Sequence, residues 1–263
     1  MKNVKMLLIF MITTTLLLAS AQRVNSLGGN VGYWADDDNS WTAFPHTINN
    51  SNLAQVSGIG MDGGHNAIVR WGDGTKWGFS WNQANANDMI NLQWGNGSMG
   101  VTFGLSMYAD GDEAATTPAA TSGMGISASW GMEMGFGEVG LGFSTSSYDD
   151  GNAGTKDDPS TMGLSVNLRR PQSLWIFDNM LVGFDYGSNN SGDGMAGFEG
   201  TYTDMGLTTS LYNHISISDN TTALLAMGFG YNAMAGSIDY EETMAASCSD
   251  GTSTDEMSCA LAF

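Results

Sequence analysis

The stretch Ser98–Tyr108 constrains the fold most strongly, because apolar and small residues alternate along its length. The apolar members are Met99, Val101, Phe103, Leu105 and Met107, and the residues between them are Gly100, Thr102, Gly104 and Ser106. A period of two indicates a β-strand with one apolar face and one small, polar face. The length matches the ~9–11 residues with which a tilted strand crosses a bilayer. We therefore expect the apolar face to meet lipid and Gly100, Thr102, Gly104 and Ser106 to face a lumen.

The same alternation recurs along most of the chain. It predicts strands at 53–60, 65–72, 75–82, 89–95, 98–108, 124–134, 138–147, 161–169, 174–187, 198–212, 221–232 and 257–263. Short connections alternate with long polar ones, as in outer-membrane barrels. The short ones include Asp73-Gly74, Asn96-Gly97, Gly135–Gly137 and Arg170-Pro171-Gln172. The pattern predicts an all-β, antiparallel transmembrane β-barrel of about 12 strands. The short segment 257–263 leaves two interpretations open: a closing strand, or a chain that is incomplete at the C-terminus.

Charge is sparse and unevenly distributed. Only 13% of the residues are charged, yet the formal net charge is −19. Arg70, Lys76, Arg169 and Arg170 flank predicted short turns, whereas acidic residues gather in the long connections. The strands carry few charges, and the lumen-facing ones are predicted to be Glu133, Asp185 and Asp204. A basic surface for nucleic acid is absent from this pattern, so no nucleic-acid partner is expected.

The N-terminal residues divide into an export signal and an irregular segment. Residues 1–21 have a basic start, an apolar core and the cleavage motif Ala19-Ser20-Ala21, which indicates a signal peptide. Residues 22–52 lack sustained alternation and precede the predicted barrel at 53–263. Export permits a disulfide, and the two cysteines of the chain, Cys248 and Cys259, are close enough in sequence to form one.

A short motif resembles the start of FadL-like and PorV-like outer-membrane proteins. It consists of Arg23, Leu27-Gly28-Gly29 and Ala35-Asp36-Asp37. The family's Asn-Pro-Ala-like turn is replaced here by Phe44-Pro45-His46. The resemblance implies a protein of the bacterial cell outer membrane whose N-terminal segment enters the barrel from the periplasmic side as a plug. It also implies that Trp34, Trp41 and Phe44 pack inside the lumen. A periplasmic tail and a first strand are the alternatives for this segment.

Residues that could carry chemistry are few. His46, His65 and His214 are isolated in the sequence, so neither a catalytic site nor a cofactor site is predicted, and we expect no enzyme. Two acidic groups, Asp36-Asp37-Asp38 and Asp149-Asp150, are weak calcium candidates, because their oxygens lie in predicted turns. Neither group has the spacing of an EF-hand loop, so solvated acidic loops are the favoured interpretation and no metal is predicted.

The sequence predicts a channel as the function. The leading hypothesis is a narrow porin-like or FadL-like outer-membrane channel for passive uptake of small or apolar solutes. One alternative is a structural or surface-display barrel without transport, and another is a secreted soluble β-sandwich that acts as a binding domain. The expected partners are outer-membrane lipid and the barrel assembly machinery, with divalent cations at the acidic loops.

Overall fold

A computed structural model describes residues 30–57, 66–82, 89–110, 121–149, 159–190, 198–218 and 221–240. These residues form one antiparallel sheet in which each strand pairs with the next one along the chain. The strands are β1 (Leu53–Ser57), β2 (Asn66–Trp71), β3 (Thr75–Asn82), β4 (Ile90–Asn96), β5 (Met99–Asp110), β6 (Thr121–Met134), β7 (Gly137–Asp149), β8 (Ser160–Leu174), β9 (Phe177–Asn190), β10 (Phe198–Ser218) and β11 (Thr221–Tyr240). The predicted all-β antiparallel architecture is confirmed, and no second sheet of a sandwich occurs in the described ranges.

The two faces of the sheet differ as the alternation in β5 predicts. Val101 and Phe103 are 36% and 47% exposed, whereas Thr102 is 3% exposed. Gly104 and Ser106 lie on the same covered side as Thr102. We call the side of Thr102 the inner face and the side of Phe103 the outer face.

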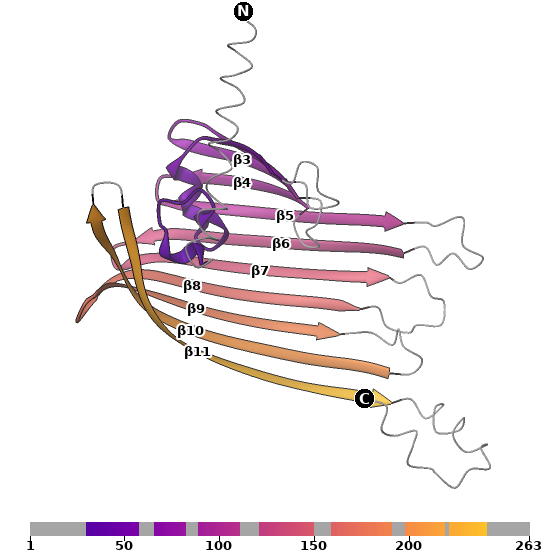
Figure 1. Ribbon diagram of the computed structural model, residues 1–263. Helices are drawn as coiled ribbons and strands as arrows, with labels where there is room; N and C mark the ends of the chain where they lie inside the picture. The colour runs from indigo at the N-terminus through magenta and orange to yellow at the C-terminus, as the bar shows by residue number, and fades with distance from the viewer. Residues whose placement is uncertain are drawn as a thin grey trace, which may run out of the picture.

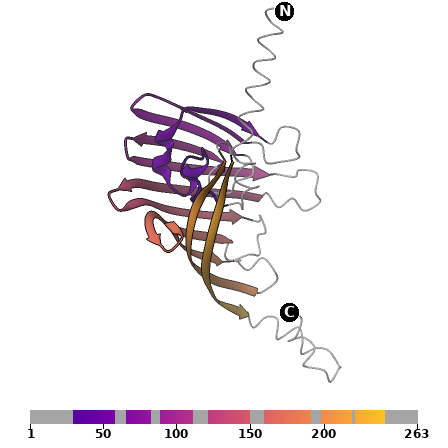
Figure 2. The same ribbon diagram turned by 60° about the vertical axis from the view of Figure 1, so that its left-hand side comes forward.

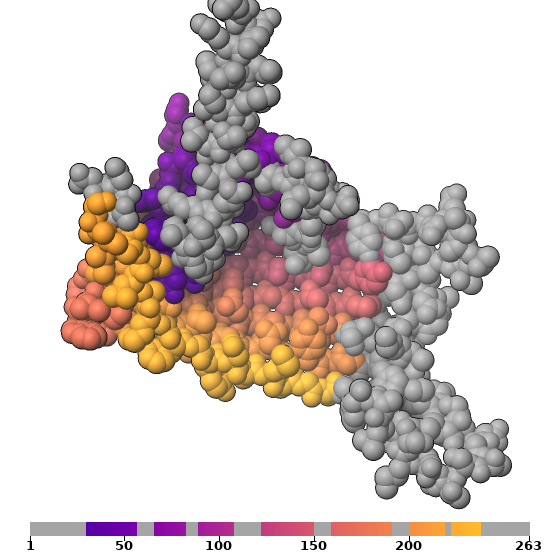
Figure 3. All heavy atoms as spheres, viewed as in Figure 1, coloured from indigo at the N-terminus to yellow at the C-terminus, as the bar shows by residue number. Residues whose placement is uncertain are grey.

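The sheet curls around its inner face. Figures 1 and 2 show that β10 and β11 bend toward the N-terminal segment (residues 30–52). This segment lies over the strand ends that carry the short turns. Among the described residues, β1 and β11 are the two ends of the strand order and do not pair with each other. In the space-filling view, β11 forms a free margin of the described sheet (Figure 3). Among the residues that the structure describes, no helix is long and apolar enough to span a membrane.

Several predicted strand boundaries are wrong. β8 continues through the expected turn at Arg170-Pro171-Gln172 as far as Leu174, with a register shift between Pro171 and Leu174. A proline fits there because an irregular stretch of strand does not need its backbone donor. The actual turn is Trp175-Ile176, where Trp175 has φ 58°. β10 and β11 also extend to Ser218 and Tyr240, because their Ser-, Ala- and Gly-containing ends still pair with each other, with a register shift between Ser216 and Ser218.

Two of the tight turns have glycine at defined positions. Asn96 pairs with Met99, so the β4–β5 loop is Gly97-Ser98 and not the expected Asn96-Gly97. Gly97 has φ 59°, a value that suits a two-residue loop with glycine in its first position. Gly72 and Gly74, which flank Asp73, also have positive φ values, of 127° and 79°.

Candidate functional site

The N-terminal segment, which we define as residues 30–52, packs on the inner face of the sheet. It contains the 3₁₀ turns η1 (Val31–Tyr33), η2 (Ser40–Thr42) and η3 (Pro45–Asn50). Local hydrogen bonds favour these turns, since the Asn30 side chain accepts from Gly32 N and Asp37 Oδ1 accepts from Asn39 N. Proline at the start of η3 suits a position where a backbone N–H would have no helical partner.

A row of glycines makes room for this segment. Its members are successive cross-strand partners on β4 to β7: Gly95, Gly100, Gly131 and Gly140. A Cβ atom on Gly100 would clash with the carbonyl oxygen of Pro45, and one on Gly140 would clash with that of Ala43. Glycine is therefore required here for the close approach of two backbones. Asn49 extends the contact, because its Nδ2 donates to the Met99 carbonyl oxygen at 2.9 Å.

A buried ionic cluster joins the segment to β7 and β8. Arg169 Nε donates to Glu138 Oε2, and Arg169 Nη1 donates to the Gly32 carbonyl oxygen at 3.0 Å. The other carboxylate oxygen of Glu138 lies 3.0 Å from His46 Nε2. The side chains of Arg169 and His46 are 4% and 6% exposed. A buried cation needs a counter-charge and hydrogen-bond acceptors, and this cluster supplies both.

Two further cations hold the other end of the segment. Arg70 is 2% exposed. Its Nε donates to Gln93 Oε1 at 2.8 Å, and its Nη1 donates to the Asp38 carbonyl oxygen at 3.1 Å. Lys76 Nζ donates to Asn52 Oδ1 at 2.7 Å. Three of the four basic residues expected to flank short turns therefore bind the N-terminal segment.

Aromatic contacts complete the attachment. Phe44 is fully buried and belongs to a small apolar core with Leu181 and Tyr212. The Arg169 guanidinium lies over the Phe44 ring, 4.4 Å from its centroid. The ring centroids of Trp34 and His214 are 4.8 Å apart. The segment thus contacts strands from β2 to β10, and its role as a plug stays a prediction.

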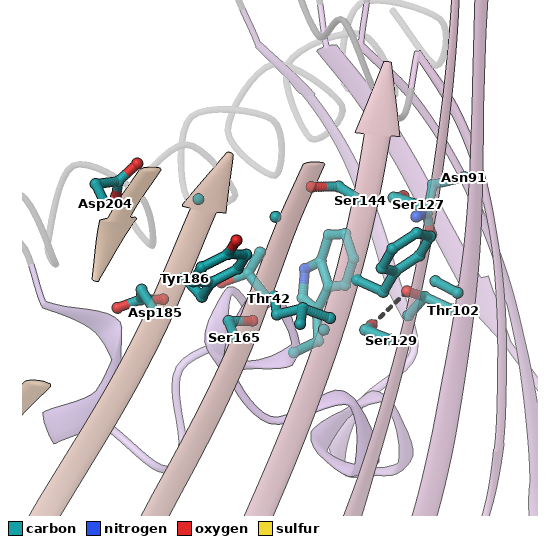
Figure 4. A pocket seen from close by; sticks show the side chains of 17 residues that line it. Thr42, Asn91, Thr102, Ser127, Ser129, Ser144, Ser165, Asp185, Tyr186 and Asp204 are labelled. Carbon is teal, nitrogen blue, oxygen red and sulfur yellow. Dashed lines mark hydrogen bonds between the residues drawn. The ribbon is translucent and has the colours of Figure 1, made fainter. Parts of the chain in front are cut away.

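A cavity of about 360 Å³ lies beside the segment on the inner face. Trp41 and Thr42 border it from the segment, and β4 to β10 contribute polar side chains: Asn91, Thr102, Ser129, Ser144, Asp185 and Asp204 (Figure 4). Thr102 Oγ1 and Ser129 Oγ are hydrogen-bonded at 2.5 Å. Trp41 is half-buried, and the Arg70 guanidinium lies 5.3 Å from its ring centroid. The cavity therefore combines aromatic and aliphatic residues with hydroxyl, amide and carboxylate groups.

The other candidate residues are dispersed. Gly100 lies under Pro45, Gly104 and Ser106 are covered, and Glu133 is exposed near the short turn that follows β6. Asp37 and Asp38 form hydrogen bonds within the segment, and Asp36 and Asp149 are exposed. The described ranges hold no group of three or more His, Cys, Asp or Glu residues that could bind a metal ion. The signal peptide, Arg23, the motif Leu27-Gly28-Gly29, Asp150, Cys248, Cys259 and the expected strand 257–263 lie outside the described residues.

Sequence reasoning missed the residues that attach the segment. Arg70 and Arg169 are expected only to flank short turns, and His46 is expected to be isolated. The alternation contained a signal for the two arginines and for Glu138, because Arg70 is in phase with the inner positions of β2, and Arg169 and Glu138 are in phase with those of β8 and β7. The direct pairing of Arg169 with Glu138 across β7 and β8 follows from that phase and the register. No local pattern indicated His46, whose partner is 92 residues away.

Comparisons with known proteins give limited information. No family model and no curated protein matches this chain. Among solved structures it is similar to OmpT folded in vitro, an outer membrane protein of Vibrio cholerae, with 13% sequence identity and a TM-score of 0.35. The match covers 66% of this chain and 64% of that one, so the chain spans less than two thirds of that protein's length.

Proposed function

We propose that this chain is an outer-membrane β-barrel that forms a narrow, porin-like channel for passive uptake of small polar solutes, with the N-terminal segment as a plug. The contrast between the two faces of one sheet carries the proposal. Apolar side chains on the outer face are exposed across the sheet, among them Phe79, Leu92, Phe103, Leu141, Phe143, Leu164, Val166, Leu207, Met227 and Phe229. An apolar surface this continuous is typical of a membrane contact and exceptional on a soluble monomer.

A row of tryptophans on the outer face supports a membrane boundary near the short turns. Trp71 pairs across strands with Trp77, and Trp77 pairs with Trp94. Val101 continues the row from Trp94 to Trp130 on β6. Tryptophan favours the headgroup level of a bilayer because its ring is apolar and its N–H is polar.

The inner face favours polar solutes over apolar ones. Its cavity is bordered by hydroxyl, amide and carboxylate groups, which an apolar solute would leave without hydrogen-bond partners. This feature supports the porin-like form of the channel hypothesis over the FadL-like form. Because lipid cannot satisfy the backbone groups of an open strand edge, the proposal requires a closed ring in the membrane.

Two measurements test the proposal. Purified protein from the membrane fraction should migrate differently on a detergent gel before and after heating, as closed barrels do, and should conduct ions in planar bilayers. Heat-modifiable protein without conductance would refute the channel and favour the structural or surface-display barrel. Release from membranes by carbonate without detergent would refute both barrel hypotheses.

A further inference from the structure

The cavity beside Trp41 has the chemistry of a carbohydrate site. The polar side chains that reach it from the inner face are mainly hydroxyls, and two carboxylates, Asp185 and Asp204, lie on the neighbouring strands β9 and β10 (Figure 4). Both carboxylates are exposed on the cavity side of the sheet. Carboxylates accept stronger hydrogen bonds than neutral oxygens do, so they suit the O–H donors of a sugar.

Trp41 borders the cavity from the N-terminal segment, and Phe143 and Tyr186 border it from the sheet. The Arg70 guanidinium lies over the Trp41 ring, and the Trp41 side chain is half-buried. An aromatic ring offers an apolar face of fixed shape, against which the C–H groups of a sugar ring can pack. One apolar surface with a few convergent polar groups is the usual composition of a small-molecule site.

Asn91 adds an unsatisfied group at the cavity wall. The residue is 1% exposed, and its Oδ1 has no hydrogen-bond partner among the described residues. Buried polar atoms are nearly always paired, so an unpaired acceptor at a cavity indicates a missing donor.

The charges near the cavity argue against anionic and zwitterionic solutes. Arg70 and Arg169, the buried cations of the inner face, are engaged by the N-terminal segment and by Gln93 and Glu138. An anion or a zwitterion would therefore meet Asp185 and Asp204 without a free cation from the described cavity wall. A neutral solute with many hydroxyls can donate hydrogen bonds to both carboxylates and brings no negative charge of its own.

We propose that this cavity binds a small neutral carbohydrate, a monosaccharide or disaccharide, through stacking on Trp41 and hydrogen bonds to Asp185 and Asp204. The inference rests on the proposed function, because it identifies the class of solute that the channel would take up. Binding can nevertheless be measured without transport, which separates the two proposals.

The test measures binding of glucose and maltose to the full chain in detergent micelles by titration calorimetry, alongside ion conductance in bilayers. We expect saturable millimolar binding and a saturable decrease in conductance on addition of either sugar. Trp41→Ala should weaken binding about tenfold or more, Trp41→Phe should retain most of it, and Asp204→Asn should weaken it. Trp77→Phe, which alters an exposed ring of the outer face, is the matched control and should bind as the wild type does.

The outcomes separate the two proposals. A conducting channel that binds neither sugar would overturn the carbohydrate inference and leave the channel standing. Sugar binding by a protein that does not conduct would support the carbohydrate site and refute the channel. Equal binding by wild type, Trp41→Ala and Asp204→Asn would place any sugar elsewhere and overturn the site. Block of conductance by Mg²⁺ but by neither sugar would identify a cation site, and would also overturn the inference.

Discussion

Replacement of Glu138 by alanine is the sharpest perturbation of the attachment between the N-terminal segment and the sheet. The carboxylate accepts from Arg169 Nε and lies 3.0 Å from His46 Nε2. Its removal leaves the Arg169 guanidinium, 4% exposed, without its counter-charge. It also leaves the buried His46 ring without its partner on the sheet.

The expected cost can be worked from this geometry. Removal of one partner of a buried ion pair costs about 3–5 kcal/mol, because the remaining charge stays desolvated. Arg169 and Glu138 belong to the sheet, whereas Gly32 and His46 belong to the segment, so the cost can be relieved when the segment detaches and water enters. Amide exchange within residues 43–50 should then accelerate by about 150-fold to 5,000-fold, at 1.36 kcal/mol for each factor of ten.

Hydrogen exchange with mass spectrometry in micelles measures this change directly. Glu133→Ala is the matched control, since Glu133 pairs with Glu138 across β6 and β7 but is exposed. The double variant Glu138→Leu/Arg169→Met should recover part of the loss, because apolar replacement of both partners removes the buried charge. Unchanged exchange in Glu138→Ala, or equal acceleration in Glu133→Ala, would refute the account of the ionic cluster.

Three further substitutions test other parts of the structure. Gly100→Ala should weaken the attachment of the N-terminal segment by about 1–3 kcal/mol, because the added Cβ would clash with the segment's backbone. Gly230→Ala is the control and should have no such effect, because the nearest atom to its Cβ would be 3.8 Å away. Hydrogen exchange of residues 43–50 compares the two variants. Phe103→Arg should destabilise the protein folded into lipid vesicles by about 2–4 kcal/mol, as measured by denaturant titration. Phe136→Arg, which changes an exposed residue in a turn, should have a much smaller effect. Equal losses of stability would contradict a lipid-facing Phe103. Gly97→Val should cost about 1–2 kcal/mol in the same titrations, since valine is strained at φ 59°, and an unchanged midpoint would contradict this turn geometry.

The strands and their faces were predictable because one periodicity determines both. In β5 the alternation places Phe103 outward and Thr102 inward, and the structure has the same arrangement. Glycine at Gly97 and Gly74 located two of the tight turns to within a residue. Local sequence contains this information because side chains on neighbouring positions of a strand must point to opposite faces.

The boundary errors came from turns without an ordinary turn signal. Pro171 indicated a turn, but it lies in an irregular part of β8, and the chain reverses at Trp175-Ile176. A non-glycine residue with positive φ is unusual, so no sequence rule would have selected Trp175. The far ends of β10 and β11 were missed because their strand structure depends on the partner strand more than on their own composition.

The attachment of the N-terminal segment could not be predicted because it depends on contacts between distant parts of the chain. Arg169 and Gly32 are 137 residues apart, and Arg70 and Asp38 are 32 apart. A charge near a short turn has the same local signature whether it faces solvent or a buried carbonyl oxygen. Alternation could have restricted Arg169 to the inner face, but it could not name the partner there.

These long-range contacts give the N-terminal segment a structural role that the sheet alone lacks. Through Arg70 it reaches β2, and through Trp34 and His214 it reaches β10, near the opposite end of the strand order. Strands that share no hydrogen-bonded ladder are thereby held at a fixed separation. Because the same segment also carries Trp41, which borders the cavity, we expect these contacts to affect the width of the cavity. A solute site built this way can be tuned by residues that never touch the solute.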